Sequence, residues 1–148
     1  MFEEINSSAF SKYKVSSYSM REKRTEVRAK RILIIDDNLD LRLSLADLLV
    51  TEGYKVATAK NGLEGLSYLL HKQLPDLILL DLKMPVLDGY QFLEKQNLNP
   101  DFAKVPVIVI SGEIDQSKIL DLTNNAFCME KPLDFLKFLD VVEQISKV

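Results

Sequence analysis

The chain has 148 residues, of which 47% are apolar and 28% charged, a length and composition that suit one globular domain with a buried core. A single cysteine, Cys128, excludes a disulfide framework, and the absence of paired Cys/His spacing excludes a structural zinc site. The first residues hold no apolar run, so we expect neither a signal peptide nor a membrane span, and we predict a cytoplasmic protein.

The net charge of −3 is unevenly distributed along the chain. Residues 1–31 carry eight Lys and Arg against four Asp and Glu, a net charge of +4, whereas residues 32–148 carry eleven against eighteen, a net charge of −7. Nucleic-acid binding needs a cationic surface that faces the phosphates. The acidic domain is therefore not expected to bind DNA directly.

The N-terminal segment lacks the periodicity of a helix or strand. Residues 1–20 contain six serines and scattered apolar residues, which predicts a disordered tail. The charged run that follows, up to Lys30, is compatible with a marginal solvated helix or with a linker of no further role. We therefore predict a polar, basic tail over residues 1–30, disordered or partly helical, and a folded domain over residues 31–148.

The first half of the domain alternates strands and helices. An unbroken apolar run, Ile32–Ile35, predicts a buried strand, and the helix that follows shows leucines three and four residues apart before Gly53 ends it. Lys55–Ala59 is predicted to be a short strand, and Asn61 to cap a helix that reaches His71. Leu77–Leu80 then predicts another strand buried on both faces.

The same alternation continues in the second half. A helix is predicted from Asp88-Gly89, a strand over Pro106–Ile110, a short helix over 115–124 and a strand over Phe127–Glu130. The final helix is expected to bury Leu136, Leu139, Val142 and Ile145, flanked by Phe135 and Phe138. Five βα units with right-handed crossovers predict a doubly wound α/β domain with a five-stranded parallel sheet.

Polar residues follow four of these strands at the point where each strand ends: Asp36, Asp37, Asp81, Ser111 and Lys131. In the flavodoxin-like strand order 2-1-3-4-5, the carboxyl ends of the strands meet at one rim, where such sheets bind ligands. Carboxylates about 4 Å apart repel by about 4 kcal/mol per pair at an effective dielectric constant of 20, so three of them favour a cation. Oxygen ligands that leave room for water and phosphate suit Mg²⁺.

The other two strand-end residues complete a site for a phosphoryl group. The ammonium of Lys131 is a compact charge that can meet an anion, and Ser111 can donate one hydrogen bond to it. A carboxylate nucleophile beside Mg²⁺ and a lysine is the arrangement needed to form an acyl phosphate.

At these positions the chain resembles the receiver domain of two-component response regulators, in the CheY-like, stand-alone form. The resemblance covers about residues 31–146 and rests on four motifs in order: Asp36-Asp37, the stretch from Asp81 to Gly89, Ser111, and Lys131-Pro132. It implies that Lys131-Pro132 shares the cis peptide bond common in receivers. It also implies a regulatory phosphoprotein with no enzymatic activity beyond Mg²⁺-dependent self-phosphorylation and autodephosphorylation.

The resemblance assigns a role to each site residue. Asp81 is implied to be the phosphoacceptor. Asp37, Asp81 and the backbone carbonyl of Lys83 are implied to bind Mg²⁺, with Asp36 assisting through water. Ser111 and Lys131 are implied to hold the phosphoryl group. The donor would be a phosphohistidine on a sensor histidine kinase or a histidine phosphotransfer protein, and the signal would pass by docking onto a protein target or by phosphorelay.

The chain departs from the receiver pattern on the fifth strand. Receivers usually carry Tyr or Phe three residues before the conserved lysine, whereas here that position is Cys128 and the aromatic residue is Phe127. Adjacent strand residues alternate sides, so Phe127 is expected on the opposite face. Either the usual read-out surface changes little on phosphorylation, or Cys128 is a small buried residue and the read-out is ordinary.

Three other functions compete with this interpretation. A flavodoxin-like carrier of FMN shares the fold, but the turn Asp36-Asp37-Asn38 is acidic and lacks donors for a phosphate. A haloacid-dehalogenase-type phosphatase would need a paired Asp-x-Asp loop and a cap domain, which the sequence lacks. In the third alternative function, the basic tail rather than the receiver is the output element.

Asp88 is expected only to cap a helix.

Overall fold

The computed structural model describes residues 4–5 and 28–147. Five parallel strands make up the central sheet, and numbering them along the chain gives the order 2-1-3-4-5 that the sequence predicts. These strands are β2 (Arg31–Ile35), β3 (Lys55–Ala59), β4 (Leu77–Leu80), β5 (Val107–Ser111) and β6 (Ala126–Glu130).

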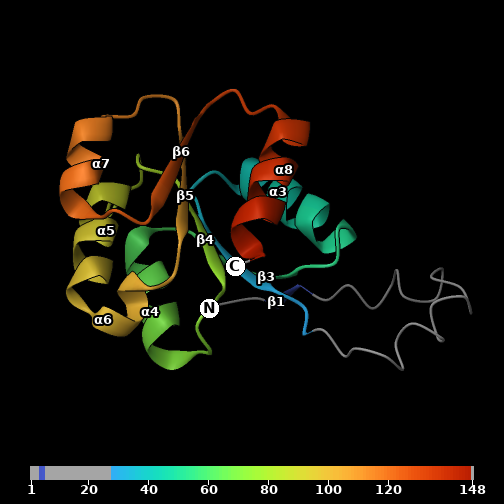
Figure 1. Ribbon diagram of the computed structural model, residues 1–148, viewed down its shortest axis with the longest axis horizontal. Coiled ribbons are helices and arrows are strands. Elements are labelled where there is room, and N and C mark those ends of the chain that lie inside the picture. The colour runs from blue at the N-terminus through green and yellow to red at the C-terminus, as the bar shows by residue number, and fades with distance from the viewer. Residues whose placement is uncertain (1–3, 6–27, 148) are drawn as a thin grey trace, which may run out of the picture.

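Helices cover both faces of the sheet and form the outer layers of a three-layer domain (Figure 1). On one face lie α4 (Gly62–His71), α5 (Gly89–Leu98), α6 (Pro100–Ala103) and α7 (Gln116–Leu122); on the other lie α3 (Leu39–Thr51) and α8 (Phe135–Ser146). Among the described residues, no helix has the length and apolar character needed to cross a membrane.

The two central strands, β2 and β4, are buried on both faces because they separate two apolar cores. Ile78 and Leu80 pack in the core beneath α4, α5 and α7, whereas Leu77 and Leu79 pack in the core beneath α3 and α8. All four side chains are almost completely buried. A strand with apolar residues on both faces therefore ends at the first residue that needs a polar environment, which is Asp81.

Short polar side chains set where the helices begin. Each N-cap side chain accepts a backbone N–H from the first turn of its helix, which stabilises the helix start. These caps are Asn38, Asn61, Asp88, Asp115 and Asp134. Asp88 and Gln91 form a reciprocal capping box, so the capping role predicted for Asp88 is confirmed.

The structure differs from the predicted disordered or partly helical tail at one place. Residues Glu4–Ile5 form a short strand, β1, that pairs antiparallel with β3 and makes the sheet six-stranded. Two residues are too few to show a strand period in the sequence, and the open backbone groups of the outermost strand β3 supply the pairing. The rest of the predicted tail lies outside the described residues, apart from residues 28–30, which have no regular structure.

Two further elements differ from the sequence prediction. The short helix α6 was not predicted; it begins after the cap Asn99, with Pro100 in its first turn. Leu136 was expected in the buried stripe of α8 but is 81% exposed. The buried stripe runs through Phe138 and Val142, four residues apart, and a position two residues before Phe138 points away from it.

Candidate functional site

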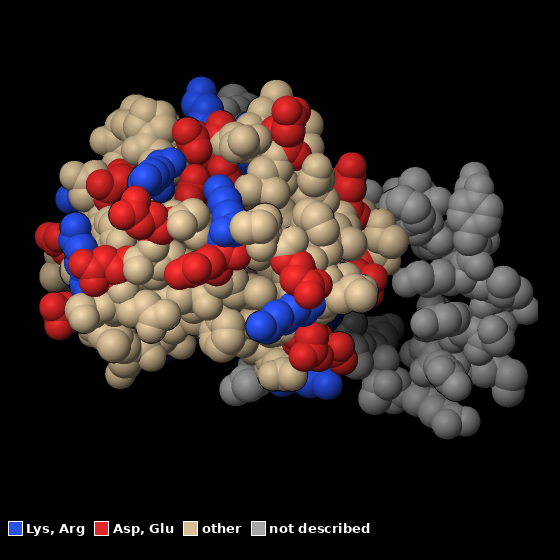
Figure 2. Space-filling model, turned by 90° about the horizontal axis from the view of Figure 1, so that it is seen from above, with Lys and Arg blue, Asp and Glu red and all other residues tan. Residues whose placement is uncertain are grey.

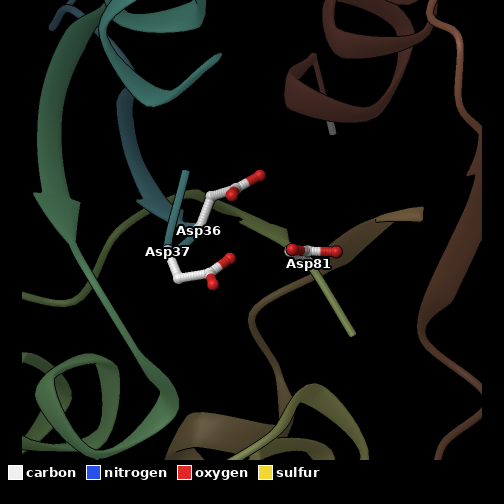
Figure 3. Close-up of side chains that lie close together, drawn as sticks. All are labelled: Asp36, Asp37 and Asp81. Carbon is white, nitrogen blue, oxygen red and sulfur yellow. The ribbon is translucent and has the colours of Figure 1, made fainter. Parts of the chain in front are cut away.

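Three carboxylates gather at the carboxyl ends of β2 and β4. The two strands are direct neighbours, so Asp36 and Asp81, each the first residue after its strand, lie side by side. Their side chains are buried, with Asp36 3% and Asp81 5% exposed, whereas Asp37 is exposed. One oxygen from each carboxylate lies within 4.8 Å of the other two, and Figure 3 shows all three groups directed toward a common space.

Backbone hydrogen bonds fix the two buried aspartates. The N–H of Asp81 donates to the carbonyl of Ile35 at 2.9 Å, and the N–H of Asp36 donates to the carbonyl of Ala59 at 3.1 Å. The carboxylate of Asp36 also accepts the N–H of Asn38 at 2.9 Å. The sheet therefore fixes the backbone of both acids on neighbouring strand ends, where their carboxylates repel each other.

Lys131 brings a cation to this cluster. Its ammonium lies 3.6 Å from a carboxylate oxygen of Asp81 and 3.8 Å from one of Asp36. The peptide bond to Pro132 is cis, as the resemblance implies. The backbone N–H of Lys131 donates to the carbonyl of Ser111 at 2.9 Å, so the lysine and the buried serine at the end of β5 are joined.

The charge balance of the site is unfavourable for ionised carboxylates. Burial, and after it the neighbouring Asp36, raise the pKa of Asp81 to about 6, although Lys131 and the N–H groups of Leu82 and Lys83 act in the opposite direction. Burial also raises the pKa of Asp36. The single positive charge of Lys131 therefore does not balance the negative charge of the three carboxylates. The cluster has the oxygen donors and the charge to hold a divalent cation.

The loop that follows Asp81 is tightly anchored and strained. The N–H of Gly89 donates to the carbonyl of Leu82 at 2.9 Å, and a Cβ atom on Gly89 would overlap the backbone oxygen of Asp81, so only glycine fits there. Val86 has a φ of 70°, and the N–H of Leu87 donates to the carbonyl of Pro85 across it at 2.8 Å, which closes a three-residue turn. A positive φ is strained for a β-branched residue.

An ion pair crosses between the two loops that border the carboxylates. The ammonium of Lys83 lies 3.3 Å from a carboxylate oxygen of Glu113, with the two side chains 76% and 83% exposed. Seen from above the carboxyl ends of the strands, this face carries many acidic side chains with basic ones among them (Figure 2). The backbone carbonyl of Lys83, predicted to bind metal, belongs to the same anchored loop as Val86.

The structure separates the two residues at the unusual position of β6. Cys128 is half-buried against the core beneath α4, α5 and α7, whereas Phe127 is exposed on the α8 side, beside Val141 and Ile145. The prediction that their side chains lie on opposite faces is therefore confirmed. Burial also raises the pKa of the Cys128 thiol, which disfavours the reactive thiolate form.

Two residues near the site were missed in the sequence. Arg42, one turn into α3, donates to the backbone carbonyl of Asp36 at 2.6 Å. Its place four residues after the helix cap Asn38 was the available signal, because such a side chain reaches back over the helix start. Tyr90 contacts Asp115 and Lys118 across α5 and α7, and no sequence spacing marks a contact between such distant segments.

The sheet order and the strand-end acids place the protein in the flavodoxin-like class of doubly wound α/β domains. The family model of the response regulator receiver domain matches residues 32–143, and the chain belongs to this family. The resemblance seen in the sequence is thereby confirmed.

Named relatives agree with this family. Sporulation initiation phosphotransferase F of Bacillus subtilis (strain 168) is 35% identical over 119 residues, which cover 78% of this chain and 92% of the relative. Chemotaxis protein CheY of Treponema pallidum (strain Nichols) is 33% identical over 119 residues, covering 79% and 83%. The receiver domain of the sensor histidine kinase PA1611 from Pseudomonas aeruginosa PAO1, solved with a magnesium ion in its active-site cleft, shares the fold, with a TM-score of 0.73, 22% identity and 82% and 100% coverage.

Proposed function

We propose that this receiver domain accepts a phosphoryl group on Asp81 from a phosphohistidine of a sensor histidine kinase or a histidine phosphotransfer protein. The observation that carries the proposal is the excess of negative charge around Asp81, a buried carboxylate with two acidic neighbours and, among the described residues, a single lysine at 3.6 Å to balance them. Such a site gains most from a ligand that brings a divalent cation and a phosphoryl group together.

Asp36, Asp37, Asp81 and the backbone carbonyl of Lys83 are the groups that would hold Mg²⁺. The donor set fits, because carboxylate oxygens from all three aspartates approach within 4.8 Å of one another. The receiver domain of PA1611 has magnesium in its cleft, which supports the same ion here. When bound, Mg²⁺ supplies charge that neutralises the phosphoryl oxygens and the attacking carboxylate.

The transfer itself needs no proton on Asp81. A carboxylate oxygen of Asp81 attacks phosphorus and forms an O–P bond, while the P–N bond breaks and the imidazole of the donor retains the electron pair. Lys131 now faces Asp36 and Asp81 and needs only a short shift to meet a phosphoryl oxygen. Ser111 donates a hydrogen bond to another phosphoryl oxygen from the end of β5.

The partners follow from this chemistry. The donor is a protein that carries phosphohistidine, and the relative named sporulation initiation phosphotransferase F supports onward transfer as one output. Docking onto a downstream protein is the other. The site does not favour FMN, because three carboxylates at the strand ends repel the phosphate of that cofactor. Nor does the domain's net negative charge favour direct contact with DNA.

Incubation with acetyl phosphate and Mg²⁺, followed by intact-mass measurement, tests the proposal. The wild-type protein should gain one phosphoryl group, and Asp81→Asn should gain none. Asp76→Asn is the matched control, because Asp76 flanks the other end of β4 and should leave the adduct unchanged. An adduct that survives Asp81→Asn, or that forms equally well in EDTA, would contradict the assignment.

The roles of Ser111 and Lys131 need a separate test, because these residues are proposed to act on the phosphorylated state. Groups that contact the phosphoryl group but not the free protein shift the equilibrium between two conformations. Ser111→Ala and Lys131→Ala should therefore reduce the amide chemical-shift changes on phosphorylation while the fold persists. Wild-type shift changes in either variant would remove that residue from the coupling.

A further inference from the structure

Tyr90, in the first turn of α5, makes two contacts that the proposed function does not use. Its hydroxyl oxygen accepts the backbone N–H of Asp115 at 3.1 Å. The ammonium of Lys118 lies 4.2 Å from the centre of its ring, within the range of a cation–π contact. Asp115 caps α7, so Tyr90 connects the start of α5 to the start of α7.

Tyr90 belongs to the same rigid frame as Asp81. The preceding residue, Gly89, donates its N–H to the carbonyl of Leu82 at 2.9 Å, directly after the phosphoacceptor position. A side chain on Gly89 would overlap the backbone of Asp81 and Leu82, so no space separates the start of α5 from the end of β4. The position of Tyr90 relative to Asp81 is therefore fixed by the backbone.

The loop that follows Ser111, residues 112–115, has its two ends fixed in different ways. At the near end, the carbonyl of Ser111 accepts the N–H of Lys131. Between the ends, a Cβ atom on Gly112 would meet nothing within 4 Å, and the ion pair of Glu113 with Lys83 is exposed and contributes little. At the far end, the backbone N–H of Asp115 donates to the hydroxyl of Tyr90, which belongs to another helix, α5.

Space for movement exists beside this contact. A cleft of about 270 Å³ lies between the two loops, bordered by Leu82, Lys83, Tyr90, Glu113, Ile114 and Asp115. The residue at the usual aromatic position of β6, Cys128, is too small to reach across the neighbouring core as a ring would. Among the described residues that line the cleft, Tyr90 is the aromatic one, and it also contacts the loop.

We propose that Tyr90 is a positioning residue for Ser111. Its hydroxyl holds residues 112–115 in the resting arrangement, and the hydrogen bond to Asp115 is given up when Ser111 moves to a phosphoryl group on Asp81. Because Tyr90 and Asp81 share one frame, a loop that moves relative to Asp81 also moves relative to the Tyr90 hydroxyl. A contact made in only one of two states favours that state, so the hydroxyl favours the resting form. This inference rests on the proposed function.

Tyr90→Phe removes the hydroxyl and keeps the ring. Loss of one neutral hydrogen bond from the resting state alone should increase the rate of phosphorylation by acetyl phosphate about fivefold. The amide resonance of Asp115 gives a signature that a merely structural role would not produce. In the wild-type protein, phosphorylation should move this resonance in the same direction as Tyr90→Phe moves it in the resting protein. Lys118→Ala, which keeps the hydroxyl bond, is the control and should phosphorylate at the wild-type rate.

The outcomes separate this inference from the proposed function. If the wild-type protein is phosphorylated on Asp81 but Tyr90→Phe reacts at the wild-type rate, or the Asp115 amide of the wild-type protein does not move, the positioning role is overturned and the proposed function stands. If the wild-type protein takes no phosphoryl group, both fail. Whether the Asp115 resonance moves on phosphorylation is measured in the wild-type protein, so a folding defect in Tyr90→Phe does not weaken that part of the test.

Discussion

The two aspartates that flank β4 have the same side chain and opposite surroundings. Asp76, just before the strand, accepts the guanidinium of Arg28 and the backbone N–H of Arg31, each at 2.8 Å. These donors lower its pKa, outweighing the effect of burial. Asp81, just after the strand, lies beside other carboxylates, and burial raises its pKa to about 6. Four residues therefore separate a carboxylate whose charge is balanced by its neighbours, Asp76, from one whose charge is not, Asp81.

This difference shows which end of the sheet is built for stability and which for chemistry. At the amino end of β4, charge and hydrogen bonds are balanced within the fold. At the carboxyl end, the fold holds repelling carboxylates together and places Val86 in a strained conformation nearby. A site whose charges are completed only by a ligand is a functional candidate, because the fold alone gains nothing from it.

The largest expected effect is on the pH dependence of stability at Asp81. Its pKa is higher in the folded than in the unfolded protein, so its contribution to the free energy of unfolding is greatest below pH 3.8 and is lost as the pH rises through about 6. Asp81→Asn cannot ionise, so the variant keeps this stability as the pH rises. In EDTA, the variant should gain about 3 kcal/mol over the wild-type protein between pH 4 and 8, measured by urea unfolding. A stability difference that does not change with pH would contradict the raised pKa.

A smaller effect of opposite sign is expected at Asp76. Its lowered pKa means that ionised Asp76 stabilises the fold above its unfolded pKa and that this stability is lost as the pH falls below it. Asp76→Asn should lower the free energy of unfolding by about 1–2 kcal/mol at pH 7, because the charged acceptor of two hydrogen bonds is lost. Arg28→Ala should cost less, since its side chain is largely exposed. A stabilising Asp76→Asn would remove the contrast between the two aspartates.

The smallest effect concerns the backbone strain at the carboxyl end. Val86→Gly should raise the free energy of unfolding by about 1 kcal/mol, because glycine adopts a positive φ without steric cost. Val86→Ala keeps a Cβ atom and should recover less of this energy. Thermal unfolding of the two variants beside the wild-type protein decides the point. If glycine destabilises the protein, as it does in ordinary loops, Val86 is not strained.

The sequence predicted the parts of the molecule that depend on local pattern. Apolar runs such as Ile32–Ile35 predicted the central strands and their order, because a strand buried on both faces leaves little choice of position. The gathering of Asp36, Asp37 and Asp81 followed from the same reasoning and is confirmed by their geometry. Their predicted roles in binding and transfer remain predictions.

What the sequence did not predict depends on contacts between distant segments. The strand Glu4–Ile5 exists only through pairing with β3, and the bond from Asp115 to Tyr90 joins residues 25 positions apart. The exposure of Leu136 has another cause. Several apolar residues in α8 offered two overlapping stripes, and packing against the sheet through Phe138 and Val142 selected one of them.

The most direct measurement locates the phosphoryl group on the chain. After incubation with acetyl phosphate and Mg²⁺, borohydride reduces an aspartyl phosphate to homoserine, and peptide mass spectrometry then identifies the modified position. We predict homoserine at position 81 and unmodified aspartate at position 76, since of the two aspartates that flank β4 only Asp81 borders the other acids and Lys131. Modification at Asp76, at Asp37 in place of Asp81, or at no aspartate would contradict the account.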